Sequence, residues 1–338
     1  MRSPHEAVVR SNRPLLALFS GVLCACALAA CGGPADEAPS DDALEAEALS
    51  SAGTAHVMPL DDGTSSDARK SFHLSYYGGR VIEKAEVVAV SWGDSVSPEI
   101  ASGMGPFYKA ALGSSYMDWL SEYDTGVNAV DGSPGTGQHV GRGSLKAAVV
   151  IHPKAHGKVL SDAAIRKELT AQITARKLPA PGPNTIYMLN FPNGISIEQG
   201  GSRSCSSGGF CAYHNSFRRR GKEIDYGVLP DLGPGSGCET GCGHGTVFDN
   251  QTSVASHEMI ETVTDPEVGL AKGLGPPLAW YDQKGGEIGD ICNGMQGKLH
   301  AASGKAYSVQ KEWSNKSKAC IAARGRGGAE DDASEDQP

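Results

Sequence analysis

"AEVVAVSW", residues 85–92, decides the fold, because this short Val-rich run is typical of a β-strand. "SPEI" at 97–100 then has the marks of a helix start: a Ser cap, a Pro in the first turn and an early Glu. Helical sequence continues through "FYKAAL" (107–112) and "SSYMDWLSEY" (114–123). The stretch therefore predicts a strand followed by a covering helix, which is the first half of a β-α-β unit.

Two further strands extend this pattern. "LKAAVVIH" (145–152) predicts a second, buried strand, and "TIYMLNFP" (185–192) predicts a third. Between them, Ser161 opens a predicted helix that Pro179 ends, and the apolar positions of this helix recur every four residues: Ile165, Leu169 and Ile173. The β-α-β-α-β order predicts a sheet covered by helices.

The second half of the chain predicts two edge strands, one helix and a region of loops. "FCAYHNSF" (210–217) and "EIDYGVL" (223–229) are expected to be the edge strands, and a Gly-rich loop leads to a helix at about 252–264. Residues 267–320 are expected to be rich in loops. The predicted fold class is α/β (α+β), with a mixed sheet, covering helices and a loop-rich, disulfide-bonded C-terminal part.

The first 30 residues have the pattern of a lipoprotein signal peptide. Basic residues precede the apolar run "LLALFSGVLCACALAAC" (15–31), which at about 16 residues before Cys31 is short for a membrane span. "LAAC" at 28–31 resembles a bacterial lipoprotein box, and this resemblance implies cleavage after residue 30 and lipid on Cys31. We therefore expect an exported protein whose lipid is its contact with the envelope membrane, the outer membrane in a diderm host. The alternative is an ordinary secretory signal.

Acidic segments flank the predicted globular part. Residues 31–70 and 323–338 are rich in Asp, Glu, Ala, Ser and Gly, so we expect a disordered tether and a disordered tail. The net charge of −9 is concentrated there. Residues 71–322 are long enough for a single globular domain, which we expect to be monomeric. The basic cluster at 218–222 is isolated, so the sequence excludes a nucleic-acid-binding surface.

Six cysteines remain once the predicted signal and lipidation site are set aside: Cys205, Cys211, Cys238, Cys242, Cys292 and Cys320. An even number in an exported chain indicates disulfides. Loop closure favours neighbours, so we expect the pairs Cys205–Cys211, Cys238–Cys242 and Cys292–Cys320. A cysteine zinc site is the alternative, although the spacings match its usual patterns poorly.

"SVASHEMIETVTDP" (253–266) begins like the zinc-protease signature H-E-x-x-H, but Glu261 replaces the second histidine. On a helix, His257 and Glu261 lie about 40° apart and can converge on one ion. Glu258 lies beside them. Two ligands one turn apart with a neighbouring glutamate as general base is the zincin arrangement, so we expect a zincin-like helix. Four residues are expected to face the core: Ala255, Met259, Ile260 and Val263.

A third ligand must come from outside this turn of helix. Glu287 and Asp290 are the favoured candidates, because Cys292 ties their loop and can hold it over the helix. Asp265 and Asp282 are the remaining candidates. Zinc accepts imidazole and carboxylate ligands, so Zn²⁺ is the expected ion. Oxygen-rich sites also suit Mn²⁺ or Ca²⁺, which stay open.

Two histidines outside the motif, His214 and His244, are expected to be structural or exposed. His214 falls in a predicted edge strand, and His244 falls in a glycine-rich loop. The alternative for each is that it reaches the site.

Several stretches together resemble the exordium-like, phosphate-induced protein family: 75–93, 107–125, 205–242 and 253–266. They are most similar to its bacterial secreted relatives, which carry HE-x-x-E, then TDP, then a W-x-D…GGEIGD-x-C stretch, here at 279–292. Plant members are similar in layout but lack the His and the first Glu. They are known as cell-wall-associated growth proteins. The resemblance implies that the metal site is an addition to the fold and not a requirement of it.

Two functions follow as expectations. The first is a surface-anchored, metal-dependent hydrolase, peptidase-like and using zinc, which acts on an extracellular peptide or another envelope substrate. Glu258 would activate a metal-bound water in this enzyme. The second is a non-catalytic cell-wall or polysaccharide binding module of the exordium-like type.

Overall fold

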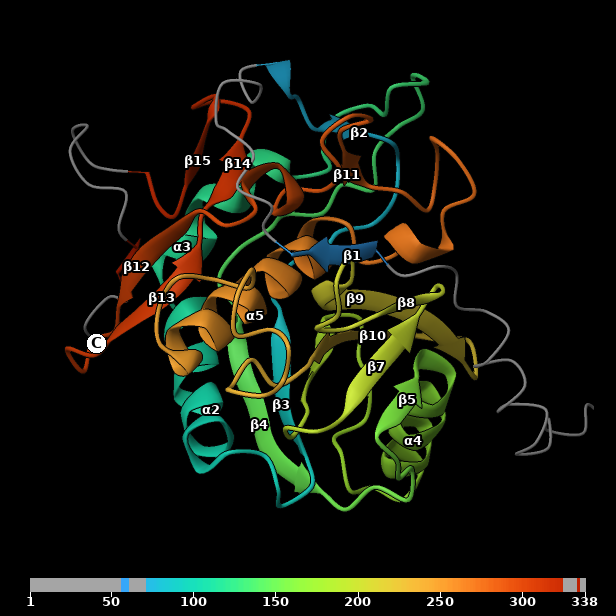
Figure 1. The fold of residues 1–338 in the computed structure, drawn as a ribbon. Helices are drawn as coiled ribbons and strands as arrows, with labels where there is room; N and C mark the ends of the chain where they lie inside the picture. Colours follow the sequence, from blue (N-terminus) through green and yellow to red (C-terminus); the bar gives the residue numbers. More distant parts are fainter. Residues whose placement is uncertain (1–55, 61–70, 325–332, 335–338) are drawn as a thin grey trace, which may run out of the picture. The chain divides into compact units, whose positions relative to one another are not determined.

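The computed structural model describes residues 56–60, 71–324 and 333–334 (Figure 1). The predicted signal peptide, Cys31, and most of the predicted tether and tail lie outside these residues. Within the described part, the search for a helix long and apolar enough to span a membrane finds none.

A six-stranded mixed sheet forms the centre of the fold. In spatial order its strands are β1 (His56–Pro59), β9 (Phe210–Arg219), β10 (Lys222–Leu229), β6 (Thr185–Asn190), β3 (Glu86–Trp92) and β4 (Ser144–Ile151). The last four of these run parallel to one another. β9 runs antiparallel to β10, and β1 runs antiparallel to β9. The mixed α+β class predicted from the sequence is confirmed.

Three strand predictions need correction. β4 was expected to be buried, but it is an edge strand whose residues alternate in exposure. β9 and β10 were expected at the edge, but each has a strand on both sides. An apolar run predicts that side chains are buried, but it does not predict which strands hydrogen-bond to its backbone. The order of the strands in the sheet could therefore not be predicted from these runs. β1 itself falls in the expected tether.

Two covering helices begin where the sequence predicts. α2 (Pro98–Leu112) starts after Ser97, and α4 (Asp162–Thr174) starts after Ser161. Each of these serines accepts a hydrogen bond from the backbone N–H three residues later, as helix caps do. α4 ends before Pro179, with a left-handed residue closing it. α2 and α4 pack into two different hydrophobic clusters, on opposite faces of the sheet (Figure 1).

The helix α5 (Val247–Thr264) crosses the interior of the molecule. It begins earlier than expected because Thr246 and Asp249 form a capping box. One side of α5 packs on β9 and β10, and another packs on β13 (Ala306–Gln310). All residues from 250 to 264 are therefore buried, including the polar ones.

The C-terminal part contains more strand than expected. β13 pairs with β12 (Gln296–His300), which also pairs with β16 (Ala333–Ser334), and β14 (Glu312–Ser314) pairs with β15 (Ala319–Ile321). β16 falls in the expected tail. The remaining short elements are β2 (Ser75–Tyr76), α3 (Ser115–Asp118), η2 (Trp119–Tyr123), β5 (Val159–Ser161), β7 (Ser196–Gln199), β8 (Ser202–Arg203), η3 (Val268–Leu270), β11 (Trp280–Tyr281) and η4 (Asp290–Cys292).

The six predicted cysteines form three disulfides, but two of the expected pairings are wrong. The bridges are Cys205–Cys238, Cys211–Cys242 and Cys292–Cys320. Proximity along the chain favoured neighbours, whereas the fold brings the loop before α5 against the start of β9. One bridge therefore fastens that loop to β9, one fastens it to the segment just before β9, and the third fastens η4 to β15.

Candidate metal centre

One turn of α5 carries the three residues that the helix motif singled out. His257 Nε2 lies 3.2 Å from Glu261 Oε2, so the two side chains converge as their spacing predicts. Glu258 is on the same turn, and all three are at most 1% exposed. The expected polar face is thus an interior surface, because β13 and the sheet enclose the helix.

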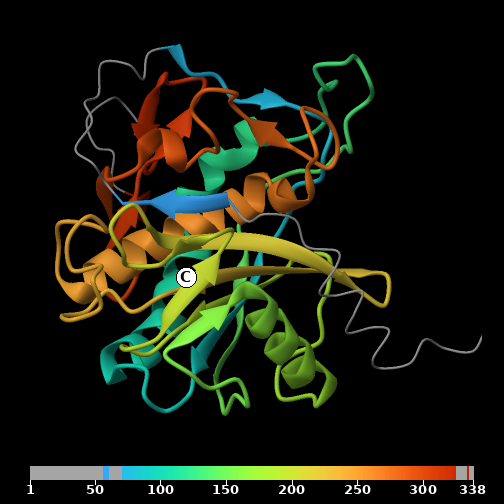
Figure 2. The same ribbon diagram turned by 45° about the vertical axis from the view of Figure 1, so that its right-hand side comes forward.

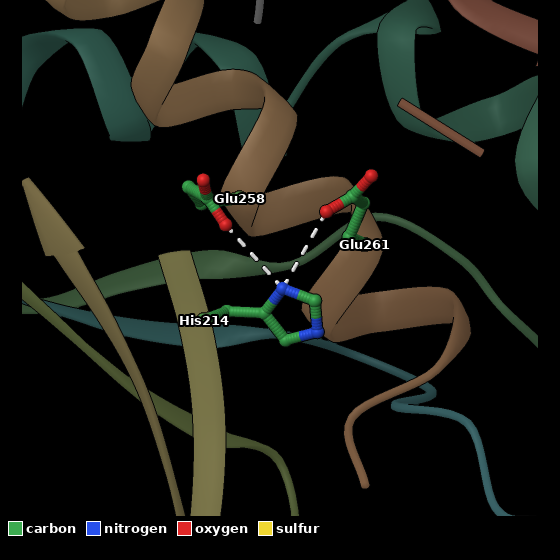
Figure 3. Close-up of side chains that lie close together, drawn as sticks. All are labelled: His214, Glu258 and Glu261. Carbon is green, nitrogen blue, oxygen red and sulfur yellow. Dashed lines mark hydrogen bonds and ion pairs between the residues drawn. The ribbon is translucent and has the colours of Figure 1, made fainter. Parts of the chain in front are cut away.

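His214 of β9 joins this group from the sheet (Figure 3). Its Nδ1 lies 3.3 Å from Glu258 Oε2 and 3.5 Å from Glu261 Oε2. The sequence pattern favoured a structural or exposed role for His214, and that reading missed its place in the cluster. A signal was present: Tyr213 and Phe217 belong to the core on the α4 side, so His214 must point to the opposite face.

The loop between β11 and η4 closes the cluster. The backbone N–H of Asp290 donates to Glu261 Oε1 at 3.0 Å, and Asp290 Oδ1 lies 4.0 Å from His257 Nε2. Glu287 Oε1 lies 3.5 Å from His214 Nε2. The structure therefore brings both favoured third ligands to the helix.

Gly289 explains how this loop comes so close. A Cβ atom at this position would lie 2.6 Å from His257 Nδ1 and 2.8 Å from Glu261 Oε1. Any side chain at position 289 would push the loop away from the helix, so the glycine is required for the close approach.

The other two carboxylate candidates have structural roles. Asp265 Oδ1 accepts the backbone N–H of Ala279 at 2.9 Å, just beyond the end of α5. Asp282 accepts three backbone N–H groups in and near its own turn, from His73, Lys284 and Gly285. These contacts leave Glu287 and Asp290 as the better placed candidates.

Two overlapping groups have ligand atoms close enough to share an ion. The atoms of His257, Glu261 and Asp290 lie within 4.8 Å of one another, and so do those of His214, Glu258 and Glu261. Glu261 belongs to both groups. It is therefore the residue on which any ion in this cluster would depend most.

Burial and mutual attraction shift the pKa values of these side chains in opposite directions. Burial would lower the pKa of His257, but the attraction of Glu261 and other carboxylates outweighs it and raises the pKa to about 10. The same balance raises the pKa of His214. Burial would raise the pKa of Glu261, but the two imidazoles lower it. For Glu258 and Glu287 burial prevails and the pKa is raised. With no ion bound, burial thus favours the neutral forms of Glu258 and Glu287 over their charged forms.

A second layer of side chains holds His257 in place. Gln310 Nε2 lies 2.6 Å from His257 Nδ1 and donates to the backbone carbonyl of Gly289 at 2.9 Å. Glu312 lies beside Gln310 and accepts a hydrogen bond from Tyr116. Nδ1 of His257 is thereby in contact with Gln310, and Nε2 of the same ring faces Glu261 and Asp290. In this contact Nδ1 accepts from the amide of Gln310, whereas a metal-binding histidine donates from its outer nitrogen, so ligation through Nε2 would require the amide of Gln310 to turn and present Oε1 to Nδ1.

The residues present fit a divalent cation. His257 Nε2 and Glu258 Oε1 are buried and make no well-aligned hydrogen bond among the described residues, although Glu261 Oε2 lies 3.2 Å from His257 Nε2. Buried polar atoms without a partner are costly, and a bound cation would satisfy them. In the ion-free cluster, the raised pKa values of the two imidazoles and the lowered pKa of Glu261 balance charge between them, so a bound cation would take the place of the imidazole protons. Zinc accepts imidazole and carboxylate ligands, and a set with two carboxylates also suits manganese or calcium.

Comparison with family models, curated proteins and solved structures gives no match for this chain. The function is therefore argued from the site itself.

Proposed function

We propose that this protein is an exported, metal-dependent hydrolase of the peptidase type, with zinc held by His257, Glu261 and Asp290. The observation that carries the proposal is the convergence of these three residues on α5 and its covering loop. Glu258 is the adjacent carboxylate on the same turn of helix. This is the ligand-plus-base arrangement of metal-dependent hydrolysis.

Each residue has a distinct part in the proposed chemistry. A bound ion would act as a Lewis acid that polarises a substrate carbonyl. Glu258 would take a proton from the attacking water, and burial supports this role because it raises the pKa of the carboxyl and makes it a better base. His214, 3.3 Å from the other oxygen of Glu258, would orient the carboxylate. Gln310 would orient His257.

The proposed location is the cell envelope. The N-terminal signal pattern, the lipoprotein-like "LAAC" and the resemblance to bacterial secreted exordium-like proteins support it. The three disulfides are compatible with an oxidising compartment. The proposed substrate is accordingly an extracellular peptide or another carbonyl compound of the envelope.

A second candidate function is a non-catalytic binding module whose ion is structural. The complete burial of His257, Glu258 and Glu261 favours it, because a closed structural zinc site leaves no position for substrate. In this case the ion would stabilise the fold, and binding of an envelope polysaccharide would take place elsewhere.

Metal analysis combined with one substitution separates the candidates. Purified protein is expected to hold about one zinc per chain, and Glu258→Gln is expected to keep the ion while losing hydrolysis of a peptide library. Glu198→Gln, on exposed β7, is the matched control and should change neither. Bound zinc with no turnover by the parent protein selects the binding module. Absence of zinc, manganese and calcium at micromolar concentrations overturns both metal-based functions.

A further inference from the structure

β1 is a four-residue strand at the outer edge of the sheet, and it pairs antiparallel with β9 (Figures 1 and 2). His56 pairs with His214, Val57 with Tyr213 and Met58 with Ala212. Along the sequence, residues 61–70 separate β1 from the rest of the domain. The other five strands form a continuous sheet without it. β1 is thus an addition to the sheet that occupies the open edge of β9.

Side-chain contacts hold β1 to both the sheet and the loop of the candidate metal centre. Met58 is 4% exposed and packs in the hydrophobic cluster on the α5 side. Val57 packs against the cluster on the opposite face. Asn293, directly after η4, donates its side-chain N–H to the carbonyl of Pro59 at 3.0 Å. The site thus accepts one apolar side chain on each face and a backbone carbonyl at its end.

Without β1, β9 would be an edge strand. Such a strand presents a row of backbone donors and acceptors that pairs readily with another extended segment. Peptide recognition by strand addition uses this property: the backbone ladder supplies affinity, and pockets for alternate side chains supply specificity. The contacts of Val57 and Met58 have this form. Pro59 lacks an N–H group and marks the point where the pairing register shifts.

We propose that the edge of β9 is a binding site for extended peptide segments and that β1 is its intramolecular occupant. The partner is a peptide in β conformation with an apolar residue at the place of Met58, and β1 must leave before that peptide binds. The inference rests on strand pairing and packing alone and requires neither a bound ion nor catalysis. A peptide in the register of β1 would run past His214 and so lie beside the candidate metal centre.

The test uses a fluorescent peptide with the sequence of residues 55–60, "AHVMPL", and the full chain in metal-free buffer. Met58→Asp places a charge in a buried position and is expected to release β1. The release should tighten peptide binding at least about tenfold over the parent, because self-occupancy reduces apparent affinity by the fraction of open protein. The double variant Met58→Cys/Ala212→Cys joins directly opposed residues and should bind less peptide than the parent.

Two controls make the outcome decisive. Alternate residues of an antiparallel edge strand donate to the ladder, so a peptide with Pro in place of both His56 and Val57 lacks a ladder donor and should not bind the released protein. Exchange of the β1 amides that pair with β9 should be slow in the parent and fast in Met58→Asp. If circular dichroism shows that variant unfolded, the double variant His56→Pro/Val57→Pro replaces it, read by exchange of the paired β9 amides. Fast exchange without tighter binding overturns the inference, as does equal binding of the two peptides. A failure of zinc binding or hydrolysis would leave these measurements unchanged, so the two proposals fail separately.

Discussion

Two buried polar clusters lie on opposite faces of the same sheet, and they balance their charge differently. On the α4 face, Asp162 pairs with Arg166 at 2.8 Å and accepts hydrogen bonds from the hydroxyl groups of Tyr213 and Tyr226. On the α5 face, the carboxylates outnumber the imidazoles. Adjacent residues of β9, Tyr213 and His214, supply one side chain to each cluster.

The difference shows that burial alone does not identify a functional site. Both clusters are nearly inaccessible to solvent, and burial raises the pKa of Tyr213 in one and of Glu287 in the other. In the Asp162 cluster, the chain supplies its own cation and its own hydroxyl donors, as expected for a structural element. In the α5 cluster, His257 and Glu258 each keep a buried atom that makes no well-aligned hydrogen bond among the described residues. The unpartnered atoms on α5, and not depth, therefore distinguish the cluster that we propose to hold a cation.

The largest expected effect is on the self-balanced cluster. Asp162→Ala leaves the guanidinium of Arg166 without its buried carboxylate and should lower the free energy of unfolding by about 3–5 kcal/mol. Urea denaturation measures the loss, which should be the same with zinc and with chelator. Asp94→Ala, at an exposed carboxylate, is the control. A loss that depends on zinc would show that the clusters are not independent.

The next effect is on ion affinity. Glu261→Gln removes the residue shared by both ligand groups and should weaken zinc binding at least about 100-fold, or about 2.7 kcal/mol. Competition with a chromophoric chelator measures it. His257→Ala and His214→Ala should then weaken zinc binding to different extents. The variant with the larger loss of zinc affinity identifies which of the two ligand groups holds the ion. Equal, small losses for all three would contradict the metal centre, and Glu198→Gln, at an exposed position of β7, serves as the acid control.

A third effect concerns the loop that covers α5. Gly289→Ala forces a Cβ atom against His257 and should destabilise the protein by about 1–3 kcal/mol, as overpacking does. Zinc affinity should fall with it, since Asp290 moves with the loop. Thermal unfolding and zinc titration measure the two effects. Gly273→Ala, where an added Cβ meets nothing within 4 Å, should be neutral.

The smallest effect lies at the start of α5, away from both clusters. Burial acts to raise the pKa of Asp249, but hydrogen bonds from Ser308 and Thr246 lower it below its usual 3.8. The stabilisation is therefore present above that pKa and is lost as the pH falls through the lowered value. Asp249→Ala should cost about 1 kcal/mol at neutral pH, and the difference from the parent should shrink in acid. Urea denaturation of both proteins at neutral and at acidic pH measures whether the difference in the free energy of unfolding shrinks in acid.

Local signals predicted the elements well and their partners poorly. The caps at Ser97 and Ser161 fixed two helix starts, because a cap acts within one turn of its helix. Strand order and disulfide pairing depend on segments far apart in the sequence. The bridge Cys205–Cys238, for example, joins residues 33 positions apart that the fold makes neighbours.

In the candidate site, too, local contacts were predicted, and contacts between distant segments were predicted only in part. Helical spacing placed His257 beside Glu261, and the bridge at Cys292 correctly suggested that Asp290 reaches the helix. His214 was missed because its partners Glu258 and Glu261 lie more than 40 positions away. Alternation along β9 gives the face of the sheet on which His214 lies, but not the residues that it meets there. The burial of the whole cluster was also missed, since it depends on β13 packing over α5.

The bridge Cys292–Cys320 ends the segment that presents Asp290, two residues away. While these thiols are reduced, only noncovalent contacts, such as the hydrogen bond from the Asp290 N–H to Glu261, would hold that segment over α5. With export as proposed above, the bridge would form only after the chain leaves a reducing interior, and the centre would be completed there.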